Sequence, residues 1–391
     1  MPLSTLLQPA LDDPAAAALA RDGGRAFVAS AMRPYLIAAL AEADANAPVL
    51  VVAADDRAAR DLAVDLRAWL KPRAVRFYPS RGVSYESHLA PPPHLVGLRI
   101  AALDALSRRE APVNPVVVVS AVALSEKVPD PELRPHGFVI EKGELLDLEE
   151  TAQDLVTAGY ERVDQVEDRG QFAIRGGILD LYPATEERAV RIDLFDDEVE
   201  SLRLFSTFTQ RSLGDADRVE IAPAAELAPE HRELAEIAAL EEERPDIAEL
   251  LPVDRFQAFF DLVPDHAHAI LAAEEEVAPA LADHWQDVCA AFHDADAHHL
   301  YVRPDEVEKA LDARARAPGG CAALPTSARA TSSSTRTTAS PASRASTPRP
   351  WPGSRAITSS SSSRAPTASS CRSTSWRRSR ATSAPAATRR P

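Results

Sequence analysis

Residues 171–205 read QFAIRGGILDLYPATEERAVRIDLFDDEVESLRLF, a stretch in which short alternating segments are separated by turn-forming residues. Alternation of apolar and polar residues is the pattern of a half-buried β-strand, and Gly, Pro and Asp favour the turns between strands. A helix over Asp147–Ala158, ended by Gly159, is predicted to precede the strands. The predicted strands are Glu161–Val166, Gln171–Arg175, Ile178–Tyr182, Ala189–Phe195 and Val199–Phe205. Together these patterns predict an antiparallel meander with one helix, which is an α+β unit.

The flanking segments have a different pattern, in which apolar runs alternate with helical segments. Pro48–Ala53 (PVLVVA) and Pro115–Ser120 (PVVVVS) are typical of strands that are buried on both faces. Further short strands are predicted at Arg25–Val28 and Val75–Phe77, and helices at Met32–Ala43, Arg57–Leu70 and Leu95–Leu106. The pattern changes after them, and a strand predicted at Phe138–Ile140 belongs to the α+β unit. Strands and helices in alternation imply a parallel sheet covered by helices. The predicted fold class is therefore α/β, with a parallel-sheet domain into which the antiparallel meander is inserted.

These patterns divide the chain into four predicted segments. Residues 1–131 form the α/β domain, and residues 132–222 form the α+β meander domain. Residues 223–316 form a second, helix-rich α/β portion, with possible strands at Phe256–Leu262 and Ala267–Leu271. Residues 317–391 form a low-complexity tail, which we expect to be disordered.

The charge of the chain limits the partners that its body can bind. Residues 1–316 carry 31 Lys and Arg against 59 Asp and Glu, a net charge of −28, whereas the whole chain carries −16. DNA affinity depends on cations that neutralise phosphates, so a broad nucleic-acid surface is not expected there. One cysteine, Cys289, precedes the tail, and neither a disulfide framework nor a cysteine-based metal site is predicted. The absence of a long apolar run or a signal-peptide pattern favours a cytoplasmic protein without a membrane partner.

The tail differs from the body in both charge and apolar content. It contains twelve Arg and no Lys, Asp or Glu. If the written frame is shifted by one base, residues 330–345 can decode as GDFVVHEDHGIARFAG, which regains carboxylates and β-patterned apolar residues together. We favour a frameshifted continuation of a folded protein. The alternative is a genuine disordered Arg/Ser tail. A tail of this composition would also lack the apolar residues needed to form a core.

A nucleotide site is not predicted. A phosphate-cradling loop needs glycines whose N–H groups approach the phosphates, and a Lys followed by Ser or Thr. The segment after the first predicted strand reads Ala29–Arg33 (ASAMR) instead. None of the four lysines follows Gly or precedes Ser or Thr. We therefore predict no cofactor-binding residues.

Three other polar groups are interpreted as structural. His293, His298 and His299 lie among aspartates, but their spacing favours a solvated loop over a metal site. His266 and His268 alternate with alanines and are expected on one face of a strand. The acidic segment Asp196-Asp197-Glu198 lies where a hairpin must turn, and Asp is favoured in turns. No catalytic residue and no metal ligand is predicted.

The arginines of the meander are more informative. In the predicted strand Ala189–Phe195, Arg191 and Phe195 share one face with Asp193, whereas Val190, Ile192 and Leu194 share the other. Likewise, Gln171, Ala173 and Arg175 are expected to face outward from their strand, opposite Phe172 and Ile174. An exposed Phe among arginines has the composition of an interface hot spot. An ordinary surface Arg beside a Phe covered by a neighbouring domain fits the pattern equally well.

The sequence also resembles a known family. Residues 159–183 (GYERVDQVEDRGQFAIRGGILDLYP) and 190–203 (VRIDLFDDEVESLR), followed by Gln210–Leu213, resemble bacterial transcription-repair coupling factors. A weaker resemblance over Ala47–Leu70 and Arg76–Leu106 extends it to most of residues 25–315. The excinuclease B subunit shares this module, but its N-terminal phosphate loop is missing here, which favours the coupling factor. The decoded tail is similar to the start of that family's RNA-polymerase-interacting domain.

The resemblance implies a function and a set of site residues. In that family the meander domain recruits the excinuclease A subunit, UvrA, and the matching positions here are Arg175, Arg191 and Phe195. RNA polymerase, DNA, ATP and magnesium would be engaged by other parts of a full-length member, including a translocase motor that this sequence lacks. The resemblance thus implies an N-terminal, UvrA-recruiting module for transcription-coupled repair. The alternatives are an excinuclease-B-like fragment and a product of a frameshifted gene that binds UvrA unproductively or has no function.

Overall fold

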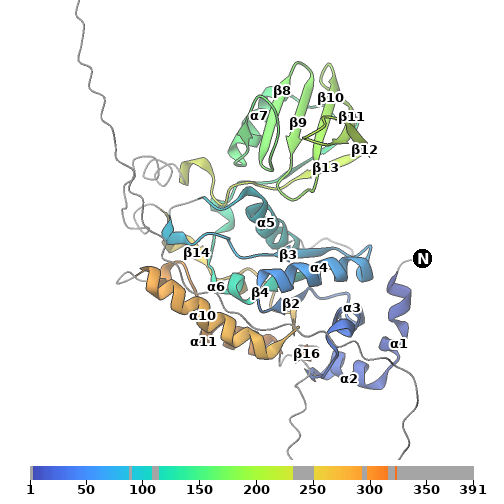
Figure 1. Ribbon diagram of the computed structural model, residues 1–391, viewed down its shortest axis with the longest axis vertical. Helices are drawn as coiled ribbons and strands as arrows, with labels where there is room; N and C mark the ends of the chain where they lie inside the picture. The colour runs from blue at the N-terminus through green and yellow to red at the C-terminus, as the bar shows by residue number, and fades with distance from the viewer. Residues whose placement is uncertain are drawn as a thin grey trace, which may run out of the picture. The chain divides into compact units, whose positions relative to one another are not determined.

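A parallel sheet forms the centre of the α/β part of the chain. The computed structural model describes residues 3–87, 90–107, 114–231, 251–292, 297–315 and 322–323. The strand order is β1-β16-β15-β2-β4-β3, with every pair parallel (Figure 1). The strands are β1 Gly24–Arg25, β2 Val49–Ala53, β3 Val75–Tyr78, β4 Val116–Ser120, β15 His268–Leu271 and β16 Ala322–Ala323. Every residue of β2 and β4 is buried, as their continuous apolar runs predict.

Helices cover both faces of this sheet. Val49 and Val51 face a core that includes α3 and α4, whereas Leu50 and Val52 face a core that includes α5, α10 and α11. Asp55 accepts a hydrogen bond from the backbone N–H of Ala58 at 2.8 Å and so caps α4. The helices are α1 Gln8–Leu11, α2 Pro14–Asp22, α3 Arg33–Ala43, α4 Asp56–Leu70, α5 Pro93–Ser107, α6 Ala121–Ser125, α10 Glu274–Phe292 and α11 Pro304–Ala315.

A second sheet, in the order β12-β11-β10-β9-β8-β7, contains the predicted meander (Figure 1). Its strands are β7 Glu161–Arg162, β8 Gln171–Arg175, β9 Ile178–Tyr182, β10 Ala189–Phe195, β11 Glu198–Phe205 and β12 Ser212–Ala216. Neighbours from β8 to β12 are antiparallel. Helix α7, Leu148–Thr157, is capped by Asp147 and contributes Ala152 and Leu155 to the core of this sheet. The predicted fold class, a parallel α/β sheet with an antiparallel meander, is confirmed.

The first strand of the meander was predicted wrongly. β7 is only two residues long and pairs with β8 in parallel, with Glu161 opposite Gln171. Beyond it, Val166 leaves the ladder and packs with Ala173 in a small core on the other face of the sheet. Ala173 therefore lies on the predicted outward face but is only 2% exposed. The alternating pattern does not reveal this cover, because it comes from a non-adjacent segment.

Several predicted strands are shorter than expected or belong to small separate ladders. β6, Phe138–Glu141, pairs with β13, Arg218–Ile221, and β14, Phe256–Gln257, pairs with β5, Val128–Pro129. The rest of the strand predicted at Phe256–Leu262 is replaced by a 3₁₀ turn that places Phe259 in the core beside α6. His266 precedes β15, so it does not share a strand face with His268. The 3₁₀ helices are η1 Leu3–Leu7, η2 Ser30–Met32, η3 Tyr85–Ser87, η4 Pro131–Leu133, η5 Val253–Arg255, η6 Phe259–Asp261 and η7 Ala297–His299.

Some sequence-based predictions fall outside the described residues. These are the interpretation of the tail, apart from Ala322–Ala323, and that of His293 with its neighbouring aspartates. The helical content predicted between residues 232 and 250 also falls outside them. Of the helices that are described, none combines the length and the apolar character needed to cross a membrane.

A buried cluster of charges lies beyond the carboxyl ends of β3 and β4. Arg99 donates from Nη1 to Oε2 of Glu126 at 2.6 Å, and Arg81 donates from Nε to Oε2 of Glu226 at 2.7 Å. The backbone N–H of Arg81 also donates to Glu126 at 2.8 Å, so the two pairs are linked. Arg99 is 2% exposed and Glu126 is 5% exposed. Since Glu226 follows β13, this cluster ties the chain that leaves the meander to the α/β layer.

We expect Glu126 to make stability depend on pH. Burial raises the pKa of Glu126 to about 7, and the attraction of Arg99 offsets this only in part. Between pH 4.5 and 7 the folded state then holds a proton that the unfolded state has lost, so the free energy of unfolding falls as pH rises. The free energy of unfolding of Glu126→Gln does not carry this pH dependence. Between pH 4.5 and 7, the wild type should therefore lose on the order of 2–3 kcal/mol of unfolding free energy relative to Glu126→Gln. Urea unfolding of both proteins at several pH values measures the difference, and parallel curves would contradict it.

Candidate functional site

The strand register places the three sequence-predicted site residues on one face of the meander sheet. Directly paired residues share a face, and Arg191 pairs with Asp180 while Asp193 pairs with Ile178, which in turn pairs with Arg175. We call this face the outer face, and it carries Arg175, Ile178, Asp180, Arg191, Asp193, Phe195, Ser201 and Arg203. The opposite face is apolar and packs with α7.

The three residues are well separated on this face. From the spacing of neighbouring strands and of residues along a strand, the Cα atoms of Arg175, Arg191 and Phe195 lie about 12–13 Å from one another. They therefore form a triangle rather than a cluster, and none contacts another. This spacing suits a flat protein surface, because a small-molecule site requires convergent groups.

Arg191 is held by an ion pair within the sheet. Its Nε and Nη2 donate to the two carboxylate oxygens of Asp180 at 2.6 and 2.8 Å, and Nη2 also donates to Oε1 of Gln210 at 3.2 Å. The guanidinium lies over the ring of Phe205, 4.8 Å from its centroid. Hydrogen bonding to Asp180 raises the pKa of Arg191. Asp180 is 3% exposed, so Arg191 compensates a buried charge as well as facing outward.

A second ion pair lies beside it on the outer face. Arg203 donates from Nη2 to Oδ2 of Asp193 at 2.5 Å, and the Ser201 hydroxyl donates to the same oxygen at 2.7 Å. Both arginines of the central strands are thus neutralised by neighbouring carboxylates. The outer face presents ordered guanidinium groups without a large net positive charge.

Among the residues that the structure describes, no carboxylate pairs with Arg175 in this way. Its Nε and Nη2 donate to the backbone carbonyl of Asp164 at 3.2 and 2.6 Å. The side chain is exposed beside a shallow depression that is also lined by Arg162, Val163, Asp164 and Ile174. A carbonyl carries no full charge, so Arg175 keeps its charge available to a partner.

Phe195 is the apolar feature of this face. It is 72% exposed at the end of β10, so no segment that the structure describes covers it. The adjacent turn, Asp196-Asp197, is confirmed as a hairpin turn, with Asp196 at φ 52°. The carbonyl of Asp197 accepts a hydrogen bond from the backbone N–H of Leu146 at 2.7 Å, which anchors the turn.

The carboxyl ends of the parallel strands, where α/β proteins commonly bind nucleotides, are filled by the chain itself. Asp56 accepts hydrogen bonds from the Ser120 hydroxyl at 2.6 Å, and from the backbone N–H of Ser80 at 2.9 Å. Two aspartates at the start of α4 would repel a phosphate. The nearby cavity, lined by Ser30, Arg33, Ala53 and Ala272 among others, measures about 160 Å³, below the ~300–1,000 Å³ of typical ligand pockets. The expectation of no nucleotide site stays a prediction.

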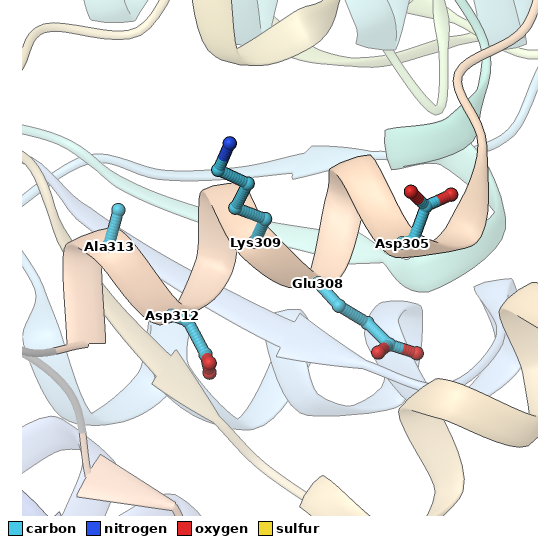
Figure 2. A pocket seen from close by; sticks show the side chains of 5 residues that line it. All are labelled: Asp305, Glu308, Lys309, Asp312 and Ala313. Carbon is cyan, nitrogen blue, oxygen red and sulfur yellow. The ribbon is translucent and has the colours of Figure 1, made fainter.

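A depression on α11 carries no site chemistry. Figure 2 shows Lys309 and Ala313 on one edge of the helix, and Glu308 and Asp312 on the other. All the lining side chains are exposed, while Val307 and Leu311 hold the buried face of α11. This arrangement is a solvated helix face. Among the residues that the structure describes, no group of three or more His, Cys, Asp or Glu is placed to hold a metal ion.

Sequence reasoning missed two features of the meander. Asp180 was not singled out, because a carboxylate in a strand looks exposed until its register with Arg191 is known. Leu145, which precedes α7, is 80% exposed and pairs with Glu198 at the tip of the β10–β11 hairpin. Its only signal in the sequence is the pair Leu145-Leu146, of which one residue must face outward if the segment is extended.

Replacing Arg191 should destabilise the meander more than replacing a neighbouring arginine. Arg191→Ala leaves the buried Asp180 without a partner, and we expect it to lower the free energy of unfolding by roughly 2–4 kcal/mol. The matched control is Arg203→Ala, which should cost less because Asp193 keeps the Ser201 hydroxyl. The double variant Arg191→Ala/Asp180→Ala should recover part of the loss. Urea unfolding measures all three, and equal losses for Arg191→Ala and Arg203→Ala would refute the assignment.

Comparisons with known proteins identify relatives of this segment. Residues 138–227 match the family model of the UvrB interaction domain, and this range contains the whole outer face. The chain is 35% identical over 204 residues to the transcription-repair-coupling factor of Bacillus subtilis, covering 52% of this chain and 17% of that protein. It is 29% identical over 252 residues to that of Escherichia coli, covering 64% of this chain and 20% of that protein.

A related repair protein matches as well. The UvrABC system protein B of Carboxydothermus hydrogenoformans is 31% identical over 221 residues, covering 51% of this chain and 32% of that protein. The chain spans about a fifth of the length of the coupling factors it matches. The predicted resemblance is confirmed: the chain is homologous to the N-terminal region of transcription-repair-coupling factors and contains a UvrB interaction domain.

Proposed function

We propose that residues 138–227 recruit the UvrA excinuclease subunit during transcription-coupled DNA repair, through Arg175, Arg191 and Phe195. The observation that carries the proposal is the exposed Phe195 on the same sheet face as two ordered arginines. This face lies within the segment that matches an interaction domain. A protein partner fits it better than a small substrate, because the three residues are spread over a flat surface.

The arginines suit protein recognition because each is held by hydrogen bonds along only one edge of its guanidinium group. Nε and Nη2 of Arg191 are occupied by Asp180, and the same atoms of Arg175 are occupied by the carbonyl of Asp164. This leaves Nη1 of each to donate to a partner. Side chains that are already ordered lose less conformational entropy on binding.

Phe195 supplies the apolar part of the contact. An aromatic side chain buries ~150–250 Å² when it enters a pocket. It stands at the end of a strand that is hydrogen-bonded on both sides, so its backbone is fixed before binding. An aromatic anchor flanked by arginines is the usual composition of an interface hot spot.

The other partners of the family would belong to other parts of a longer protein. The relatives extend far beyond the fifth that this chain spans, and contacts with RNA polymerase and DNA, and use of ATP, would lie there. An excinuclease-B-like role is the alternative, favoured by the match to UvrABC system protein B. A competing, unproductive UvrA-binding product is the third reading. All three share the same docking surface.

The proposed surface can be tested with purified UvrA. Phe195→Ala should weaken binding by about 30-fold or more, the effect of losing ~2 kcal/mol at a hot spot. Arg175→Ala should weaken binding with little effect on folding, because its intramolecular bond is to an exposed carbonyl. The measurement is the equilibrium dissociation constant by biolayer interferometry.

The chain offers a matched control for this experiment. Phe208 is 95% exposed in the turn between β11 and β12, at the opposite end of the sheet from Phe195. Phe208→Ala removes the same side chain and should leave UvrA binding unchanged. If Phe195→Ala binds UvrA as tightly as Phe208→Ala does, the outer face is not the docking surface.

A further inference from the structure

Leu145 is an exposed apolar residue that the proposed site residues do not include. It is 80% exposed, more than Phe195, although it belongs to a segment with a fixed backbone. Residues 143–146 run alongside the tip of β11, where β12 has already ended. The backbone N–H of Gly143 donates to the carbonyl of Val199, and that of Val199 donates to the carbonyl of Glu144, both at 2.9 Å.

The register places Leu145 on the outer face. Leu145 pairs with Glu198 on one side of β11, and Phe195 pairs with Glu198 on the other. Since directly paired residues share a face, all three side chains project in the same direction. Two strand spacings separate Leu145 from Phe195, which is about 10 Å between Cα atoms. The two side chains are thus too far apart to cover each other but close enough to enter one partner.

The exposure of Leu145 is imposed by the fold. The neighbouring Leu146 packs against the meander core, and alternation then turns Leu145 outward. The next residue, Asp147, caps α7 by accepting hydrogen bonds from the N–H groups of Glu149 and Glu150 at 2.8 and 3.0 Å. The segment is therefore anchored on both sides of Leu145, and the side chain cannot turn inward without breaking the ladder or the cap.

We propose that Leu145 and Phe195 together form a two-pronged apolar contact with UvrA, so that the docking surface extends from β10 across β11 to residue 145. This inference rests on the proposed function of the outer face. The proposal implies that UvrA has two apolar recesses, one for Leu145 and one for Phe195. Between them lies a group that can pack against Glu198 without repelling it. The surface is continuous with the proposed one, and residues 138–227 of the interaction-domain match include all three residues.

A second copy of this chain fits this surface poorly. A two-fold contact centred on the hairpin tip would place Glu198 near its own copy, with Asp196 and Asp197 adding further negative charge. Like charges brought together at an interface oppose binding. A partner without a carboxylate at this point avoids that repulsion, and the proposal therefore commits to UvrA.

The experiment compares Leu145→Ser with a matched leucine. Leu213, on β12 toward the other end of the sheet, is 49% exposed, and Leu213→Ser is the control. Binding of the full chain to purified UvrA is measured by biolayer interferometry, with urea unfolding of each variant as the check on folding. We expect Leu145→Ser to weaken binding about 10-fold, the usual effect of removing one buried leucine from an interface. Leu145→Met should bind like the wild type, because it keeps the apolar bulk.

Phe195→Ala, measured beside these variants, separates the two proposals. If Phe195→Ala weakens binding and Leu145→Ser equals Leu213→Ser, the extension to Leu145 is wrong while the proposed function stands. If neither Phe195→Ala nor Leu145→Ser weakens binding, the proposed docking face itself is wrong. If Leu145→Ser also lowers the stability of the fold, Leu145→Lys decides the matter, because an exposed Lys is compatible with folding but not with an apolar recess. Unchanged binding by Leu145→Lys would overturn the inference.

Discussion

The meander sheet must bury one face against α7, and this requirement fixes the positions of the residues on the other. Phe172, Leu179, Leu181, Val190 and Ile192 are all at most 1% exposed. A shift of any strand by one residue would move its apolar side chains into water and its charged side chains into the core. The bulge in β11, between the partners of Asp193 and Leu194, adjusts the ladder so that Val199 still faces inward. Arg175, Arg191 and Phe195 are held outward by the same constraint.

The outer face is not simply a polar surface. Its central part is ordered by Arg191 with Asp180 and by Arg203 with Asp193, and a small second core lies under Val166 at its edge. Arg191 consequently has two roles that a binding experiment alone cannot separate, because its loss leaves the buried carboxylate of Asp180 without its ion-pair partner. Arg175, Leu145 and Phe195 do not compensate a buried charge within the sheet. They report on partner contact more directly than Arg191 does.

The carboxyl ends of the strands in the α/β layer are lined by charged side chains of the chain itself. The start of α4 is occupied by Asp55 and Asp56, and the space beyond β3 and β4 is occupied by the pairs Arg99–Glu126 and Arg81–Glu226. These buried side chains are partly hydrogen-bonded to one another and to the backbone, which reduces the cost of removing their charges from water. Since Glu226 lies just after β13, the same charges hold the exit of the meander against the layer.

The sequence by itself determined the fold class, the limits of β8, β9 and β10, and the resemblance to transcription-repair coupling factors, because each depends on local periodicity or on contiguous residues. It also identified which side chains of β10 face outward, since strand alternation is a local property. Only the tertiary structure decided the parallel pairing of β7, the burial of Ala173, the ion pair of Asp180 with Arg191, and the position of Leu145 on the same face as Phe195. Each of these joins two different segments of the chain. No pattern within a single segment specifies which other segment it will meet, because that choice is made by the packing of the whole sheet.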